Sequence, residues 1–316
     1  MKENIIKTDK WTTSKMPDQT GRIAVVTGAN SGLGLISTRE LARKGARVVM
    51  ACRNMEKAEK ARDDLRAELP ESLLDVMELN LADLSSVRRF TEKYKNKYGR
   101  LDILLNNAGL MAIPYAKTKD GFEMQFGTNH LGHFALTGRL MDIIVKTRGS
   151  RIVTVSSAAA ALGKINFDNL MNESSYNRWR AYGTSKLANI LFAYELRRRL
   201  ERGGKETVSI AAHPGSSATG LRTDLMDSKT PFLHRIMSRF FEIISQSAYM
   251  GALPQLYAAT ESEPGGCAYI GPNGLFQRAG YPACVRSPAS SYDEALAARL
   301  WAVSEELTGV KYDFGE

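Results

Sequence analysis

A short apolar segment, a glycine-rich turn and a helical pattern follow one another directly near the start of this chain. Ile23 to Thr27 has no polar interruption before its last residue, as expected of a strand that is buried on both faces. Gly28 to Gly34 then reads Gly-Ala-Asn-Ser-Gly-Leu-Gly, and an apolar pattern with helical period runs from Leu35 to Lys44. Because glycine lets a backbone approach a pyrophosphate and a helix N-terminus favours negative charge, this order predicts a dinucleotide-binding turn. Its spacing, G-x-x-x-G-x-G, differs from the general G-x-G-x-x-G.

The rest of the sequence keeps alternating between short apolar segments and longer helical patterns. Further strands are predicted at residues 47–52, 73–79, 101–105, 151–155, 208–212 and 268–270, and helices at 55–69, 84–98, 121–146, from 182 onward and at 291–307. Such alternation indicates parallel strands joined by crossover helices. We therefore predict an α/β chain with a doubly wound Rossmann fold, a mostly parallel seven-stranded sheet with helices on both faces. It would form a single domain over residues 21–316, after an N-terminal extension of residues 1–20.

One segment of this domain, residues 221–249, is rich in large apolar side chains such as Phe232, Phe240 and Phe241. Two interpretations remain open. The segment could be a helix in the core, or it could be a lid over an apolar substrate pocket, since it follows the end of a strand.

The composition argues against several classes of protein. The net charge is +9 with a pI near 9.4, but the positive residues are scattered, and the densest run, Arg197 to Arg199, suits a solvated helix face. Such a balance suits a nucleic acid, an anionic surface or a phosphate-rich cofactor, and because the positive residues are scattered we expect no nucleic-acid partner. No stretch reaches the roughly 18 apolar residues of a membrane helix, and residues 1–20 show no secretory signal. We expect no membrane anchor and a cytoplasmic location.

Cysteine and histidine positions indicate neither a disulfide framework nor a metal site. Cys52, Cys267 and Cys284 are far apart in the sequence and form no C-x-x-C pair, so reduced thiols are expected. His130 and His133 could share a helix face, but no acidic or cysteine partner stands at ligand spacing. These two histidines are expected to be packed or hydrogen-bonded helix residues.

The end of the second strand bears on which cofactor the chain would select. In dinucleotide sites an acid at this place accepts the ribose hydroxyl of NAD, whereas an arginine accommodates the 2′-phosphate of NADP. Here Cys52 stands in that place and Arg53 follows. A guanidinium is present and a repelling carboxylate is missing, which favours NADP. The alternative is that Arg53 only ends a strand in solvent.

A tyrosine and a lysine stand four residues apart in Tyr182-Gly-Thr-Ser-Lys186. On a helix they would share a face, and the cation would favour the phenolate and lower the pKa of the tyrosine. Two further strands end in small and polar residues, at Asn106-Asn107-Ala108-Gly109 and at Ser156-Ser157. Small residues admit a flat ligand, and the amides can hold its hydroxyls.

Taken together, these motifs resemble the short-chain dehydrogenase/reductase family over roughly residues 20–310. The motifs are Thr27-Gly28-x-x-x-Gly32-x-Gly34, Asn106-Asn107-Ala108-Gly109, Asn129, Ser157, Tyr182-x-x-x-Lys186 and Pro214-Gly215. Ala51-Cys52-Arg53-Asn54 and the run from Gly127 to Phe134 are similar to the retinol dehydrogenase-like and protochlorophyllide reductase-like branch, and the stretch from Leu300 to Gly309 to bacterial oxidoreductases of that branch.

The resemblance implies a role for each matching position. Tyr182 would exchange a proton with the substrate oxygen, and Lys186 would lower the pKa of Tyr182 and bind the nicotinamide ribose. Ser157, rather than Ser156, would hold the carbonyl oxygen, and Asn129 would hold a water that connects Lys186 to solvent. The cofactor-binding residues that the resemblance implies are Gly28, Asn30, Ser31, Gly32, Leu33, Gly34, Arg53, Asn80, Leu81, Asn107, Ala108, Gly109, Tyr182, Lys186, Pro214, Gly215 and Thr219. Asn80 departs from the family, which usually has Asp beside the adenine.

The resemblance implies an NADP(H)-dependent oxidoreductase that interconverts an apolar carbonyl compound and its alcohol. Two alternatives are a non-catalytic NADP-binding sensor or scaffold on the same fold, and light-driven ring reduction of the protochlorophyllide type. For the latter an additional thiol is expected between Ser157 and Tyr182, and none of the cysteines lies there. A homo-oligomer could form through the helices that carry Asn129 and Tyr182, unless the insertion before Tyr182 obstructs it.

Overall fold

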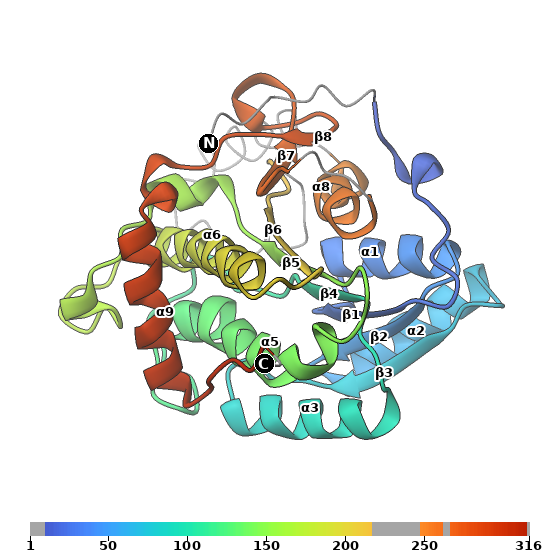
Figure 1. Ribbon diagram of the computed structural model, residues 1–316, viewed down its shortest axis with the longest axis horizontal. Coiled ribbons are helices and arrows are strands. Elements are labelled where there is room, and N and C mark those ends of the chain that lie inside the picture. Colours follow the sequence, from blue (N-terminus) through green and yellow to red (C-terminus); the bar gives the residue numbers. More distant parts are fainter. Residues whose placement is uncertain (1–9, 217–246, 262–265, 315–316) are drawn as a thin grey trace, which may run out of the picture.

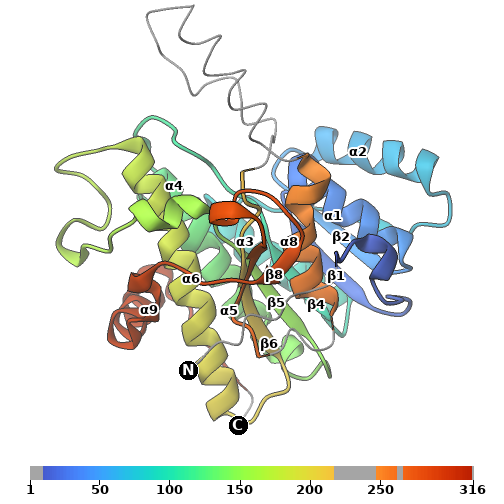
Figure 2. The same ribbon diagram turned by 90° about the horizontal axis from the view of Figure 1, so that it is seen from above.

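In the computed structural model, a central sheet lies between two layers of helices (Figure 1). The structure describes residues 10–216, 247–261 and 266–314. Figure 2, turned by 90°, shows α1 (Gly32–Arg43), α2 (Met55–Glu68) and α8 (Ala248–Thr260) on one side of the molecule and α6 (Arg178–Arg202) and α9 (Glu294–Thr308) on the other. The doubly wound α/β architecture predicted from the alternating pattern is confirmed.

Apart from α8, β8 (Pro282–Cys284) and the helix predicted at 121–146, the elements begin and end close to the predicted positions. The strands are β1 (Ile23–Thr27), β2 (Arg47–Cys52), β3 (Leu74–Glu78), β4 (Ile103–Asn106), β5 (Arg151–Val155), β6 (Val208–Ala212), β7 (Tyr269–Pro272) and β8 (Pro282–Cys284). The helices are α1 (Gly32–Arg43), α2 (Met55–Glu68), α3 (Leu84–Lys97), α4 (Met124–Phe126), α5 (Gly132–Ile144), α6 (Arg178–Arg202), α8 (Ala248–Thr260) and α9 (Glu294–Thr308).

The strand order is β3-β2-β1-β4-β5-β6-β7-β8, and all neighbours are parallel except β7 and β8. Winding starts at β1 and proceeds outward in both directions, so the order reverses between β1 and β4. In a sheet of this type a crevice opens at the carboxyl ends of the strands beside that reversal. The glycine turn after Thr27 and the amides after β4 lie at this crevice.

Alternate residues of the strands face the two helical layers, because successive side chains of a strand point to opposite faces. Val26 and Met50 belong to the apolar cluster formed with α1, α2 and α8. Val25 and Val49 belong to the cluster formed with α3 and α5. Both faces of the sheet are therefore buried, which explains the uninterrupted apolar sequence of β1.

The sheet has eight strands rather than the predicted seven. β8 is three residues long, begins with a proline and pairs antiparallel with β7. A segment so short carries no period in the sequence, so the pattern gave no indication of it.

The same hairpin corrects the expectation of reduced thiols. Cys267 and Cys284 form a disulfide, with their Cα atoms 5.7 Å apart. Cys267 precedes β7 and Cys284 ends β8, so pairing of the strands brings together two cysteines that are 17 residues apart in the sequence. Because of this disulfide, the cysteines no longer support a reducing compartment. Cys52 is the free cysteine among the described residues.

The helix predicted for residues 121–146 is interrupted. α4 is followed by a π turn, Gly127–Leu131, and only then by α5. π turns break the regular i+4 hydrogen-bond pattern and are frequent at functional sites. Asn129 lies in the middle of this turn.

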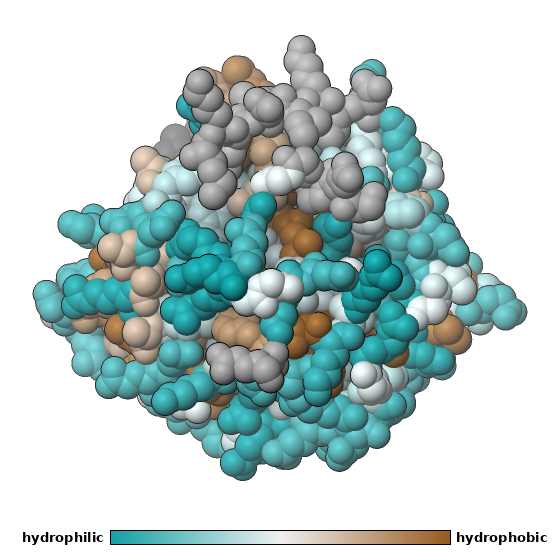
Figure 3. All heavy atoms as spheres, in the orientation of Figure 1, coloured by the Kyte–Doolittle hydropathy of each residue, from teal (hydrophilic) through white to brown (hydrophobic). Residues whose placement is uncertain are grey.

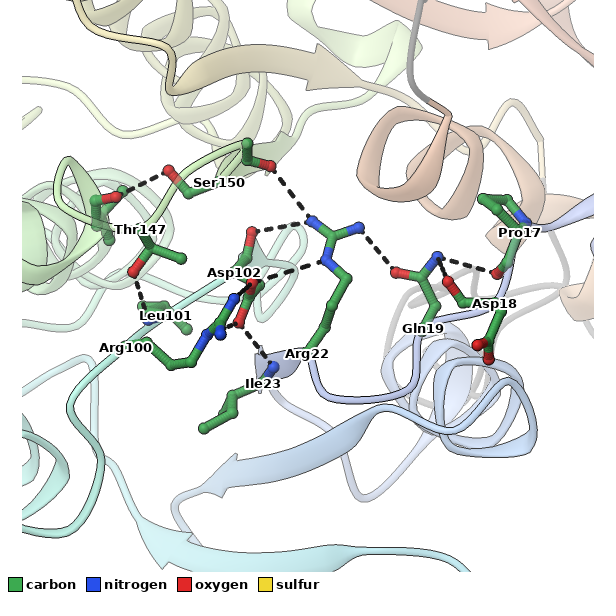
Figure 4. Close-up of polar contacts among 12 residues, drawn as sticks. Pro17, Asp18, Gln19, Arg22, Ile23, Arg100, Leu101, Asp102, Thr147 and Ser150 are labelled. Carbon is green, nitrogen blue, oxygen red and sulfur yellow. Dashed lines mark hydrogen bonds and ion pairs between the residues drawn. The ribbon is translucent and has the colours of Figure 1, made fainter.

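The end of the predicted N-terminal extension packs against the domain. Trp11 is buried, donates to Glu261 Oε1 at 2.7 Å and contacts the edge of the Tyr257 ring. Gln19 accepts a hydrogen bond from Arg22, and Arg22 reaches Asp102 at the start of β4 (Figure 4). Residues 11–22 are thus attached both to α8 and to the amino ends of β1 and β4.

The C-terminal segment covers part of α5. The hydroxyl of Tyr312 donates to the carbonyl of Phe134 at 2.7 Å, and its ring lies 4.4 Å from that of Trp301 on α9. A side chain at Gly138 would meet the Tyr312 ring at 2.6 Å. α9 in turn packs along α6.

The surface in the view of Figure 1 is mainly hydrophilic, with apolar residues visible only in small areas (Figure 3). Among the described residues, no helix is both long and apolar enough to cross a bilayer. No group of three or more metal-ligating side chains comes together there either. The lid predicted at residues 221–249 falls almost entirely outside the described residues, and its last two residues belong to the start of α8.

Candidate active site

The glycine turn after β1 has the geometry of a phosphate-binding turn. Gly28 and Gly32 have positive φ values of 65° and 53°, which glycine adopts without strain. A side chain at Gly34 would lie 2.3 Å from the carbonyl oxygen of Gly28. α1 begins at Gly32 with Ser31 as its N-cap, so the first amides of the helix face the turn. Asn30 lies in the turn, and Leu33 packs against the core below it.

The turn after β4 is tied to the end of β1 by Thr27. The Thr27 hydroxyl accepts the amides of Asn107 and Ala108, each at 2.9 Å. The Asn107 side chain donates to Thr27 O at 2.8 Å and accepts from Gln255 of α8 at 3.2 Å. The small side chain of Ala108 lies against Gly28. Two loops far apart in the sequence therefore form one floor at the reversal of strand order.

Asn129 is held from three sides. Its side-chain oxygen accepts the amide of Leu110 at 2.8 Å, and its side-chain nitrogen donates to Leu110 O and to Ser185 Oγ, both at 2.9 Å. A side chain at Gly109 would meet both Asn129 Oδ1 and Lys186 Nζ at 3.2 Å. The π turn, the β4 loop and α6 thus converge beside the Lys186 ammonium.

The two serines after β5 have different surroundings. Ser156 is buried, and its hydroxyl donates to the carbonyl of Lys186 at 2.8 Å. Ser157 is partly exposed, is the N-cap of a short 3₁₀ turn and forms a side-chain hydrogen bond with Tyr182. The serine that faces the tyrosine is therefore the second one.

Tyr182 and Lys186 lie on one face of α6, in its second and third turns. Both are buried, at 8% and 4% exposure, and the Lys186 Nζ lies 5.8 Å from the centroid of the Tyr182 ring. Lys186 donates to the carbonyl of Val155 at 3.1 Å. Burial lowers the pKa of Lys186 to about 8.

The expected lowering of the Tyr182 pKa by Lys186 is not seen in the chain by itself. Burial raises the pKa of Tyr182, and the hydrogen bond from Ser157 opposes this rise. The Lys186 Nζ donates to Val155 O and lies over the face of the Tyr182 ring.

The segment after β6 is supported by the β7–β8 hairpin. His213 Nδ1 accepts the amide of Gly215 at 3.3 Å, and its Nε2 donates to Gln277 Oε1 at 2.9 Å. Gly215 has a φ of 66°, and a side chain there would lie 2.4 Å from Arg278 O. Pro214 is therefore held at the same edge of the sheet as the other loops. Thr219 lies outside the described residues.

The end of β2 has an uncharged residue followed by an exposed arginine. Cys52 is buried, and its pKa is raised to about 11 by burial, so it carries no charge at neutral pH. Arg53 is exposed and pairs with no carboxylate in the part of the chain that the structure describes. Nearby, Lys57 lines the groove that starts at Asn30 and Ser31.

The adenine side contains the residue that departs from the family. Asn80 uses its side-chain oxygen to accept the amide of Ala82 at 3.1 Å. Its backbone amide donates to Ser86 Oγ at 3.0 Å, and its side-chain nitrogen has no partner among the described residues. Leu81 is buried. A Cβ atom at Gly132 would lie only 2.4 Å from the carbonyl oxygen of Leu81. This loop is thereby fixed against the start of α5.

Several residues that hold this arrangement were not identified from the sequence. The sequence indicates Thr27 only as part of a motif, and His133 only as a packed or hydrogen-bonded helix residue. Gln255 lies on α8, which the sequence pattern did not predict. Backbone carbonyls such as Val155 O carry no signal in a sequence. A buried polar residue within an apolar helical pattern, such as His133, was the one available signal.

Known proteins resemble this chain in sequence and in fold. The sequence profile described as short chain dehydrogenase matches residues 22–230. Human retinol dehydrogenase 14 is 40% identical over 311 residues, which cover 92% of this chain and 87% of that protein. An uncharacterized protein from Mycobacterium paratuberculosis has a crystal structure that is 42% identical, with a TM-score of 0.79, covering 96% of this chain and all of that one.

A more distant structure shares the fold alone. A short chain dehydrogenase from Shigella flexneri, solved in complex with NADP, is 20% identical with a TM-score of 0.59, covering 78% of this chain and 94% of that one. The chain described here therefore belongs to the short-chain dehydrogenase/reductase family, oxidoreductases that act on alcohols and carbonyl compounds, and within it is retinol dehydrogenase-like.

Proposed function

We propose that this protein is an NADP(H)-dependent oxidoreductase that interconverts an apolar aldehyde or ketone and the corresponding alcohol. Its catalytic residues would be Asn129, Ser157, Tyr182 and Lys186. The observation that carries the proposal is the pairing of Tyr182 with Ser157 on one side and Lys186 on the other, within a buried cluster at the carboxyl edge of the sheet.

Each side chain has a distinct part in such a reaction. The bound nicotinamide would supply or accept the hydride. Ser157 would donate a hydrogen bond to the carbonyl oxygen, and Tyr182 would transfer its phenolic proton to that oxygen as negative charge develops. Lys186, held by Val155 O, would stabilise the phenolate that remains. Asn129, fixed by Leu110 and Ser185, would hold the water that connects Lys186 to solvent. Through this water Tyr182 would regain its proton.

The two pKa directions suit this division of work. A tyrosine whose pKa is raised by burial stays protonated at neutral pH and can serve as an acid. A lysine whose pKa is about 8 is charged at pH 7 and can lose its proton at slightly higher pH. The reduction of a carbonyl would thus be favoured at neutral pH, and the oxidation of an alcohol at alkaline pH.

Preference for NADP over NAD rests on Arg53 and on the uncharged Cys52 beside it. A planar guanidinium can bind a phosphate with two hydrogen bonds. Two structural neighbours, from Shigella flexneri and Escherichia coli, were solved with NADP and NADPH. The same turn would bind the pyrophosphate through the amides that follow Gly28, Gly32 and Gly34.

An apolar substrate is suggested by the curated relatives, which carry the name retinol dehydrogenase. The test is a panel of aldehydes, ketones and alcohols with apolar groups of increasing size, assayed with NADPH or NADP. The absorbance of the reduced nicotinamide measures turnover. We expect turnover that improves with apolar size. Tight binding of NADPH with no turnover of any compound would instead support the sensor or scaffold alternative.

A further inference from the structure

His133 connects the two loops that converge on the proposed site. It lies in the first turn of α5 and is 1% exposed. Its Nδ1 is 3.0 Å from the backbone carbonyl of Asn129, and its Nε2 is 3.0 Å from the hydroxyl of Thr27. The imidazole therefore spans the distance between the π turn and the end of β1.

The partners of His133 determine where its proton resides. The carbonyl of Asn129 can only accept, so Nδ1 must carry a hydrogen if the two atoms are to attract each other at 3.0 Å. The Thr27 hydroxyl already accepts the amides of Asn107 and Ala108. With both lone pairs engaged, this hydroxyl is left to donate. Two acceptors face it, Nε2 of His133 at 3.0 Å and the carbonyl of Leu105 at 3.3 Å, and the shorter contact is the one to Nε2.

The opposite tautomer leaves the network unsatisfied. A proton on Nε2 would be a third donor to the Thr27 oxygen. It would also place the Nδ1 lone pair against the Asn129 oxygen, which is a repulsive contact. A doubly protonated ring would meet the same third-donor conflict, and burial together with the charge of Lys186 disfavours it by lowering the pKa of His133 to about 4. A neutral ring with its proton on Nδ1 donates to Asn129 O and lets Nε2 accept from the Thr27 hydroxyl, whose proton it shares with Leu105 O.

We propose that His133 is a positioning residue. Its neutral imidazole, protonated on Nδ1, holds Asn129 at a fixed position relative to Thr27 and to the loop of Asn107 and Ala108. On one side, its N–H fixes the rotation of the π turn, which aims the Asn129 side chain at Leu110 and Ser185. On the other side, it orients the Thr27 hydroxyl that receives the amides of the β4 loop. This inference rests on the proposed function only for its effect on turnover.

Few side chains could take this place. The contact needs a donor and an acceptor on opposite sides of one rigid group, which is what a neutral imidazole offers. Phenylalanine fills a similar volume but makes neither hydrogen bond. Asparagine can present an N–H near the position of Nδ1, but it is too short to reach Thr27. The two variants therefore separate the two halves of the contact.

The first test reads the tautomer directly and needs no substrate. The protein is labelled with ¹⁵N histidine and long-range ¹H–¹⁵N spectra are recorded at pH 7. The chain has four histidines, and the signals lost in His133→Asn assign the ring in question. We expect a neutral ring protonated on Nδ1. A proton on Nε2 alone, or on both nitrogens, would overturn the proposal even if the protein proved inactive.

The second test measures turnover and cofactor affinity in the two variants. His133→Phe should lower kcat by about 10- to 100-fold, because displacing catalytic groups by about 1 Å has effects of this size, and it should weaken NADPH binding. His133→Asn should recover part of kcat while NADPH binding stays weak, because only the bond to Asn129 is restored.

A matched control is Phe134→Leu. Phe134 is the adjacent residue and is equally buried, but it packs against Phe192, Trp301 and Tyr312, away from the site. It should lower stability without changing kcat per folded molecule. If His133→Phe behaves like Phe134→Leu, the positioning role is wrong. If the unmodified protein turns over no carbonyl compound, the proposed function fails, while the tautomer measurement still decides the role of His133.

Discussion

The ammonium of Lys186 lies 5.8 Å from the centre of the Tyr182 ring, one helical turn along the same face of α6. It is bonded to Val155 O, and Tyr182 has Ser157 as its own partner. The phenol and the ammonium thus approach the site from different sides, each fixed by a residue at the end of β5. This arrangement leads to predictions for activity, cofactor choice and stability.

Replacing Tyr182 by Phe should abolish carbonyl reduction, with kcat falling by about 10²- to 10⁴-fold, since the variant has no phenolic proton to transfer. Steady-state rates with the best substrate of the panel measure this. NADPH binding, followed by nicotinamide fluorescence, should change little, because the ring remains in place. Turnover comparable to that of the unmodified protein would remove Tyr182 from the mechanism.

Replacing Arg53 by Ala should weaken NADPH binding by about 10- to 100-fold, the range expected when a hydrogen bond to a charged group is lost. NADH binding should remain within about twofold, since NADH lacks the 2′-phosphate that Arg53 would contact. Titrations with both cofactors compare the two effects. Arg88→Ala is the control, because Arg88 is an exposed residue on α3 that lies 4.0 Å from Glu92. Equal losses for both cofactors would contradict a phosphate contact.

Replacing both Cys267 and Cys284 by Ala should lower the free energy of unfolding by about 3 kcal/mol, the entropic effect of opening a loop of about this length. Urea denaturation of the oxidised protein and the variant gives the difference. Adding a thiol reductant should destabilise the unmodified protein and leave the variant unchanged. A loss of stability in the variant on adding the reductant would contradict this assignment, because the variant has no disulfide to reduce.

Acidification should destabilise the protein through three buried imidazoles. Burial lowers the pKa of His130 to about 3 and those of His133 and His213 to about 4. The unfolded chain, with an ordinary histidine pKa near 6.5, takes up these protons first, so stability is lost as pH falls from about 6.5 towards 4. Each ring should lower the free energy of unfolding by about 1.4 kcal/mol at pH 5.5 relative to pH 7.5.

Urea midpoints at the two pH values measure this loss. In His130→Leu, the difference between the two pH values should shrink by about a third, whatever happens to the stability at pH 7.5. A difference as large as in the unmodified protein would show that His130 contributes nothing to it.

The sequence was sufficient for the order and type of most elements, because β1, β2, β5 and β6 are buried on both faces and read as apolar segments. It was insufficient where three-dimensional contacts decide the structure. The π turn at Asn129 is one such place, since its residues keep a helical pattern. β8 is another, since it has three residues and depends on β7 and the disulfide for its position.

The residues proposed as catalytic were indicated by motifs, and their neighbours were not. Tyr182 and Lys186 are spaced by one helical turn, which is visible in a sequence. The bonds that orient them come from Val155 O and Ser157, and the bonds around Asn129 come from Leu110 and Ser185. Such contacts depend on the placement of distant segments, so no local pattern encodes them.

The C-terminal segment has a consequence for how copies of this protein can meet. α9 lies along α6, and Tyr312 seals the surface of α5 at Phe134 and Gly138. These are the helices through which a homo-oligomer was considered from the sequence. The chain thus covers this surface itself, and we predict that a second molecule would have to displace the segment around Tyr312 in order to pack there.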